Sequence, residues 1–140
     1  MILLDTNVIS EALKPGSDPH VMQWIDAQVL STLHLSSITL AEVRFGIASM
    51  PKGKRRTTLN AQFEERVVPL FAGRVLNFDA GASIEYARLR ASARSQGTAI
   101  SMADACIAAI AVFNGCAVAT RDTAPFLAAG LKVINPWVAR

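Results

Sequence analysis

The sequence predicts an α/β domain in which helices cover both faces of a central, mostly parallel sheet of about five strands. Short apolar runs alternate along the chain with longer segments of helical periodicity. The apolar runs are nearly continuous, as in strands that are buried on both faces. The length of 140 residues is that of one domain. We therefore expect a single three-layer α/β/α domain over residues 1–140.

Each expected element has a local signal. The expected strands are the apolar runs at residues 2–4, 33–35, 74–78, 117–120 and 132–135. The first expected helix begins at Asp18-Pro19, where Asp caps the helix and Pro fits its first turn. The others cover residues 38–50, 57–68, 80–95 and 101–115. The last helix lies between Ser101, a favourable N-cap, and Asn114-Gly115, a favourable C-terminal pair.

The composition is that of a compact globular protein, with 51% hydrophobic and 18% charged residues. We find neither a secretory signal nor an apolar run of roughly 18 residues, so we expect a cytoplasmic protein without a membrane span. Cys106 and Cys116 lack the spacing of a metal site, and we expect buried thiols.

The net charge of +3 favours contact with a polyanion without establishing it. Two basic sets are candidates for phosphate contacts: Lys52, Lys54, Arg55 and Arg56 in one run, and Arg90 and Arg94, four residues apart on an expected helix. A solvated surface explains the same residues equally simply, and both explanations stay open.

Four acidic residues fall where a parallel sheet places its functional groups, beyond the carboxyl ends of the strands. Asp5 and Asp122 follow apolar runs, while Glu42 and Asp104 lie about one turn inside expected helices. Apolar residues at helical spacing around these two predict that both project from faces packed against the sheet. A carboxylate on such a face is costly unless it is paired or binds a metal.

Each acid also has a purely structural explanation. Asp5 and Asp122 can cap the helix or turn that follows them. Glu42 and Asp104 each complete a capping-box pattern, with Thr39 and Ser101 respectively. Taken together, however, four acids at one edge of a sheet would repel one another unless a cation compensated them. Oxygen ligands without His or Cys favour Mg²⁺ or Mn²⁺, which predicts a metal-dependent nuclease.

The segments around these acids resemble the PIN-domain proteins of the VapC type, close to the FitB-like branch. The similarity rests on LLDTNVISE, SSITLAEVRFGI, ISMADACIAAIA, VATRDT and VINPW, in this order from residue 1 to about 137. The resemblance implies a PIN-like fold and a Mg²⁺- or Mn²⁺-dependent endoribonuclease that acts as the toxin of a toxin–antitoxin pair. It implies that Asp5, Glu42, Asp104 and Asp122 form the acidic metal site, with Asn7 and Thr120 beside it.

The resemblance also implies partners. These are an RNA substrate, a small DNA-binding antitoxin that blocks the site, and operator DNA bound through that antitoxin. A homodimer and a larger complex with the antitoxin are usual in this family. Many relatives carry an acid before the phenylalanine that follows the fourth motif, but here Pro125 precedes Phe126. This departure affects a fifth ligand and leaves the four acids intact.

Two alternatives share some of these features. A haloacid-dehalogenase-type phosphatase or a receiver domain needs a second acid near Asp5, and Asn7 stands two residues on instead. A subunit of a DNA-bound regulatory complex, with weak or no nuclease activity, stays open because FitB-like proteins are associated with such complexes. The presence of all four acids favours the enzyme.

Overall fold

A computed structural model describes residues 1–139. Its centre is a five-stranded sheet in the order β3-β2-β1-β4-β5, and every pairing in it is parallel. The strands are β1 (Ile2–Leu4), β2 (Leu33–Ser36), β3 (Val75–Leu76), β4 (Ala117–Ala119) and β5 (Val133–Ile134). All five lie within the expected apolar runs or, for β2, one residue beyond. The predicted fold class is confirmed, and the sheet is parallel throughout.

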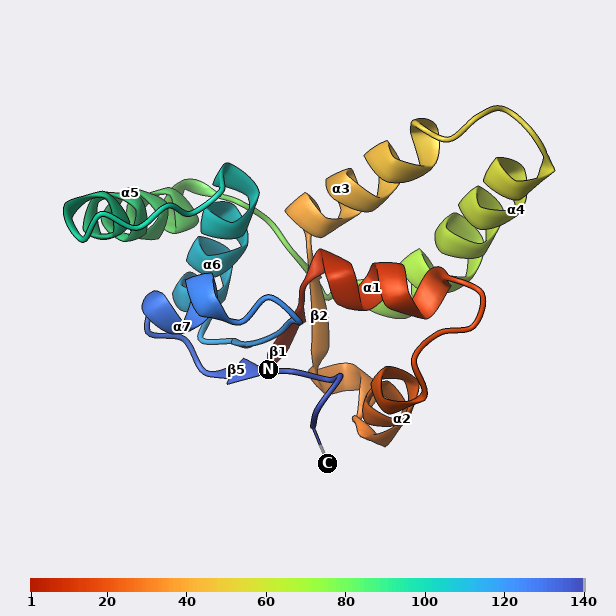
Figure 1. The fold of residues 1–140 in the computed structure, drawn as a ribbon, viewed down its shortest axis with the longest axis horizontal. Coiled ribbons are helices and arrows are strands. Elements are labelled where there is room, and N and C mark those ends of the chain that lie inside the picture. The colour runs from red at the N-terminus through yellow and green to blue at the C-terminus, as the bar shows by residue number, and fades with distance from the viewer. Residues whose placement is uncertain (140) are drawn as a thin grey trace.

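Helices cover both faces of this sheet (Figure 1). The helices are α1 (Thr6–Leu13), α2 (Pro19–Ala27), α3 (Ser37–Ala48), α4 (Lys54–Gln62), α5 (Ala80–Ser95), α6 (Met102–Asn114) and α7 (Ala124–Ala128). The first four lie on one side of the sheet and the last three on the other (Figure 1). The predicted cap of α2 is confirmed, because the Asp18 side chain accepts a hydrogen bond from the His20 N–H.

The structure corrects the expected helix at residues 57–68. Helix α4 begins three residues earlier, at Lys54, and a π-helical segment, Phe63–Val67, replaces its expected second half. This segment buries Phe63 completely. A 3₁₀ turn follows at Val68–Phe71, where Pro69 has no N–H with which to continue an α-helix. Helices α1 and α7, which are short, were not predicted as helices.

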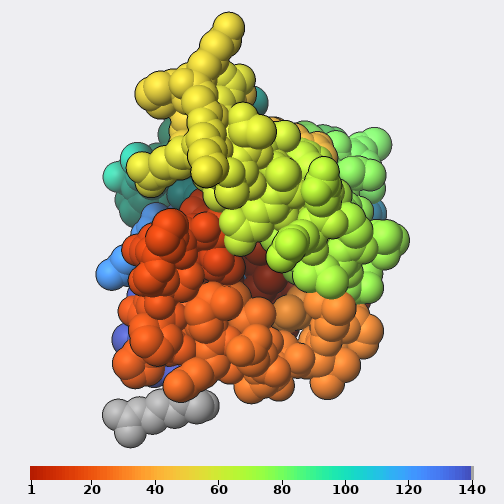
Figure 2. All heavy atoms as spheres, turned by 90° about the vertical axis from the view of Figure 1, so that its right-hand side faces the viewer, coloured from red at the N-terminus to blue at the C-terminus, as the bar shows by residue number. Residues whose placement is uncertain are grey.

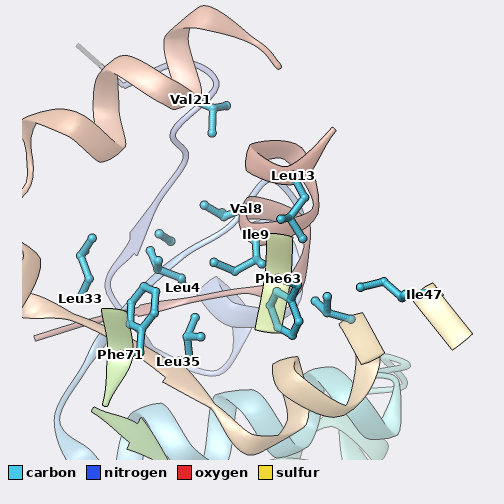
Figure 3. Packing of buried hydrophobic residues seen from close by; sticks show 12 residues of the cluster. Leu4, Val8, Ile9, Leu13, Val21, Leu33, Leu35, Ile47, Phe63 and Phe71 are labelled. Carbon is cyan, nitrogen blue, oxygen red and sulfur yellow. The ribbon is translucent and has the colours of Figure 1, made fainter. Parts of the chain in front are cut away.

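Alternating side chains of the central strands divide the core into two layers. Leu4 and Ala119 face α1, α2, α3 and the segment 63–71, where Phe63 and Phe71 point toward the sheet (Figure 3). Leu3 and Val118 face the other way and pack against α5, α6 and α7. Since a strand turns successive side chains to opposite faces, burial on both sides explains the continuously apolar runs.

The register of the central strands places their polar ends together. The Asp5 N–H donates to the carbonyl of Ala119, and the Thr120 N–H donates to that of Ile134. The residues directly after β1 and β4 are thereby held at one edge of the sheet. Cys106 and Cys116 are buried free thiols, as predicted. Among residues 1–139, no helix combines the length and apolar character needed to cross a membrane.

Candidate functional site

Asp5 is a buried carboxylate at the carboxyl end of β1. Its Oδ1 atom accepts from the N–H of Thr6 at 2.8 Å. Asp5 therefore caps α1, as its purely structural explanation predicted. Its Oδ2 atom accepts from the Thr120 hydroxyl at 2.7 Å. Only 4% of the residue is exposed. Asp5 is therefore both a helix cap and a fixed acid at the edge of the sheet.

Thr120 connects the ends of β1 and β4. Its fully buried hydroxyl donates to Asp5 and accepts from the Asn7 side-chain amide at 3.2 Å and from the Asp122 N–H at 3.1 Å. The Asn7 Oδ1 atom in turn accepts from the Arg121 N–H at 3.3 Å. Asn7 and Thr120 thus lie beside the acids, and both orient the segment that carries Asp122.

Asp122 is exposed and does not cap α7. Helix α7 begins after Thr123 without a side-chain cap, so the capping explanation for Asp122 is wrong. Burial is the main reason that the pKa of Asp104 is raised, and the negative charge of Asp122 adds to this increase.

Glu42 lies on α3 but not on the face that was expected. The face of α3 that packs into the core carries Thr39, Val43 and Ile47, whereas Glu42 is exposed and Phe45 is 74% exposed. The expected capping box is also wrong, because Ser36 rather than Thr39 caps this helix. Glu42 therefore faces solvent.

A chain of hydroxyl groups connects Glu42 to the end of β1. The Thr6 hydroxyl donates to Glu42 Oε1 at 2.6 Å and lies 3.2 Å from the Thr39 hydroxyl. Because one hydroxyl has a single proton, Thr39 is the donor in the second contact. The sequence analysis did not identify Thr6 as a site residue. The only indication of its role in the sequence is its position between Asp5 and Asn7.

Asp104 lies in the first turn of α6 and is partly buried. Ser101 caps the helix by accepting from the Asp104 N–H at 3.1 Å, which confirms half of the predicted capping box. Burial raises the pKa of the Asp104 carboxyl, a hydrogen bond with Ser101 opposes this, and the charges of Asp122 and Glu42 add to the increase. An acid at this position gains from a nearby cation.

The raised pKa of Asp5 indicates whether a cation fits the site. Burial raises the pKa of Asp5 from 3.8 to about 6, although hydrogen bonds from Thr120 and Thr6 favour the charged form. The negative charges of Asp104 and Glu42 raise it further. Asp5 thus lies within the electric field of two other acids, and oxygen donors of this kind suit a hard divalent cation.

The acids are near one another without forming a closed ligand set. Among the described residues, no three His, Cys, Asp or Glu side chains are already gathered as metal ligands. Glu42 is instead held by the Thr6 hydroxyl, and Asp122 is exposed. Mutual repulsion of the carboxylates explains this open arrangement. Because Glu42 and Asp122 are exposed, their side chains can turn inward without repacking the core.

The two basic sets lie on different parts of the molecule. Lys52 belongs to the turn between α3 and α4, and the rest of its set, Lys54, Arg55 and Arg56, forms the first turn of α4. This yellow segment stands out from the body in Figure 2. Arg90 and Arg94 lie on α5 and line one surface hollow, so they share a helix face as predicted.

Fold and site together define a parallel α/β domain that presents four carboxylates near the carboxyl edge of its sheet. The chain belongs to the PIN-domain family, whose model matches residues 2–130.

Individual relatives agree with this assignment. The chain is 58% identical to "Plasmid stability protein StbB" of Pseudomonas syringae pv. tomato, over 99% of this chain and 100% of the relative. It is 58% identical to "VapC ribonuclease Y4jK" of Sinorhizobium fredii, over 98% of each chain. It is 47% identical to "Toxin FitB" of Neisseria gonorrhoeae, over 98% of this chain and 99% of the relative. The predicted resemblance to VapC and FitB proteins is confirmed.

A solved structure gives the same result for the fold. FitAB bound to an IR36 DNA fragment superposes with a TM-score of 0.95 at 46% identity, covering 100% of this chain and 98% of that one. The predicted PIN-like fold is therefore confirmed.

Proposed function

We propose that this protein is a Mg²⁺- or Mn²⁺-dependent endoribonuclease that acts as the toxin of a toxin–antitoxin pair. The observation that carries the proposal is the buried Asp5, which two donors hold in place within the field of Asp104 and Glu42. Acidic side chains that lie close together destabilise the folded state unless a cation compensates for their charge, so such a group indicates a functional site.

Asp5, Asp104, Glu42 and Asp122 would hold the metal. When bound, such an ion activates a water molecule and stabilises the negative charge of a phosphodiester during its hydrolysis. Thr120 holds Asp5 by donating a hydrogen bond, and Asn7 holds Thr120. Thr6 orients Glu42 through its hydroxyl. The contacts to Asp5 hold this ligand in place before the metal arrives, whereas Glu42 has to turn inward from Thr6 to join it.

The names of the relatives support the toxin role and the partners. One relative is named a VapC ribonuclease and another a toxin, and the FitAB structure contains DNA. We infer that a small DNA-binding antitoxin neutralises this protein and that the pair binds operator DNA through the antitoxin. A homodimer of the toxin, and a larger hetero-oligomer with the antitoxin, complete the proposed assembly.

The first test is RNA cleavage by the purified protein. With total tRNA and defined RNAs, we expect cleavage in Mg²⁺ or Mn²⁺, and a loss of at least about 100-fold in EDTA, because the carboxylates alone cannot activate water. Re-adding metal should restore the activity. Cleavage that persists unchanged in EDTA would contradict a metal-dependent mechanism and would indicate a contaminating nuclease.

The second test concerns the antitoxin. We expect expression of this chain alone to slow bacterial growth, and co-expression with the small protein encoded beside its gene to restore growth. The Asp5→Asn variant is the matched control, since it should be harmless without any antitoxin. Equal growth with and without the neighbouring gene, at equal protein levels, would contradict the toxin role.

A regulatory subunit with weak or no nuclease activity is the second candidate. It is favoured by the FitAB structure, which was solved with DNA. Under this alternative, the purified pair would bind operator DNA tightly, whereas the isolated chain would leave RNA intact in every metal.

A further inference from the structure

A hollow of about 500 Å³ adjoins two of the four acids. It lies between α5, the loop 96–101, the first turn of α6 and α7, and both Asp104 and Asp122 line it. Leu89, Ile100 and Pro125 supply apolar surface, while Gln96 and Thr98 supply hydrogen-bonding groups. The hollow therefore combines an apolar lining with polar groups directly beside the proposed reaction site.

A second hollow, of about 520 Å³, continues from the first. Both are lined by Ala93, Thr98, Ala99 and Ile100, so they form one continuous depression along α5 and the loop that follows it. Its far end carries Arg90 and Arg94. Arg88 also lines the first hollow, but it forms an ion pair with Glu85 at 2.7 Å. One end of the depression is thus acidic, and the other end is basic.

The two arginines are placed to meet an anion. Arg90 donates to the Tyr86 hydroxyl at 2.9 Å and lies over the Tyr86 ring, which orients its guanidinium group without neutralising it. Within residues 1–139, neither Arg90 nor Arg94 forms an ion pair. Both charges are therefore free to bind phosphate.

We propose that this depression binds single-stranded RNA next to the cleavage site. One nucleoside occupies the hollow beside Asp104 and Asp122, and the following phosphate binds Arg90 and Arg94. This inference rests on the proposed ribonuclease function. Three properties support it: the hollow can hold a nucleoside, its apolar lining suits the face of a base, and the order of acidic, apolar and basic surface matches a strand that leaves a metal site.

The polar side chains that line the first hollow would determine which base is bound there. Gln96 and Thr98 can form hydrogen bonds with the edge of an unstacked base, whereas the proposed task of the four acids is to hold the metal at the scissile phosphate. The basic run at residues 52–56 lies outside this depression, on the opposite side of the molecule (Figure 1). Phosphate contacts there would select no base.

Filling the hollow tests the proposal. Ala93→Trp places a large side chain where the two hollows meet, and Ala87→Trp adds the same side chain to an exposed position of α5 outside both. For a defined oligoribonucleotide, we expect kcat/KM to fall at least about 10-fold in Ala93→Trp and to stay within about twofold in Ala87→Trp. Hydrolysis of bis(p-nitrophenyl) phosphate should be unchanged in Ala87→Trp, which lies outside both hollows, and this confirms that an added tryptophan on α5 leaves the acids intact.

Arg94→Ala tests the basic end by binding. Because Arg94 is exposed, this variant is informative even if Ala93→Trp folds poorly. With labelled single-stranded RNA in EDTA, we expect the slope of log affinity against log salt to decrease by about 0.7. Lys54→Ala, in the basic run at residues 52–56, is the comparison. A salt slope that decreases in Lys54→Ala but not in Arg94→Ala would place the RNA on the basic run and overturn the proposal.

Failure of the inference and failure of the proposed function are distinguishable. If the wild-type protein cleaves RNA and both Ala93→Trp and Arg94→Ala behave as wild type, the depression is not the RNA site and the ribonuclease assignment stands. If the wild-type protein cleaves no RNA, the ribonuclease assignment fails, and the salt slope of Arg94→Ala alone decides whether RNA binds here.

Discussion

The Asp5→Asn variant is expected to lose RNA cleavage by at least about 100-fold, because even an outer partner of a metal ligand is worth 10–100-fold. The same substitution should stabilise the metal-free protein. Asn is as good a helix cap as Asp, so the hydrogen bond from Thr6 is retained. The variant no longer buries a negative charge beside Asp104 and Glu42. Loss of function combined with a gain in stability is the signature expected of a ligand.

The pH dependence of stability gives the sign and size of the stabilisation expected for Asp5→Asn. The pKa of Asp5 is about 6 in the folded protein, above its unfolded value of 3.8, so the folded state binds more protons between these values. The free energy of unfolding of the metal-free protein therefore falls as the pH rises from about 4 to 6. A difference of about two pKa units corresponds to about 3 kcal/mol. In Asn the amide NH₂ faces the Thr120 hydroxyl, which loses its acceptor, and this loss offsets about 1 kcal/mol of the gain.

Chemical denaturation from pH 4 to pH 8 in EDTA measures this difference directly. We expect the variant to exceed the wild type by about 2 kcal/mol at pH 7.5 and by much less at pH 4. Added Mg²⁺ should raise the stability of the wild type alone. A variant that is less stable than the wild type at pH 7.5 without metal would contradict the electrostatic cost assigned to Asp5.

The position of Asp5 was predictable because it depends on a local pattern. Three apolar residues followed by an acid mark the end of a buried strand, and the parallel topology brings Asp122 to the same edge. The order of apolar runs and helices was enough to obtain the three layers. Strand ends and acids could be assigned without knowing any distance.

The contacts of Glu42 were not predictable in this way. Its partner Thr6 is 36 residues away, and the contact depends on how α3 packs against α1. Helical periodicity placed Glu42 on the inner face of α3 because Ile38 and Phe45 are spaced around it, but Phe45 is 74% exposed. The widening of the helix at Phe63 likewise follows from the shape of the core, which local propensities do not describe.

Thr120→Val is expected to weaken metal binding by about 10–100-fold while leaving all four acids in place. Valine has nearly the same shape as threonine but cannot donate to Asp5 or accept from Asn7 and Asp122. The hydrogen bond from Thr120 lowers the pKa of Asp5, so its loss raises that pKa further and favours the protonated form that cannot bind a metal. RNA cleavage at low Mg²⁺ should decrease accordingly.

Thr120→Ser is the matched control, because it keeps the hydroxyl and removes only a buried methyl group. Both variants should lose stability, by about 1–3 kcal/mol for the valine variant, which leaves buried polar groups unpaired, and by about 1 kcal/mol for the serine variant. Only the valine variant should need more Mg²⁺ for half-maximal cleavage, and excess Mg²⁺ should restore much of its rate. A valine variant that needs no more Mg²⁺ than the serine variant would show that the Thr120 hydroxyl has no specific part in metal binding. The hydrogen bond to Asp5 would then be a consequence of the fold and not a means of preparing the metal site.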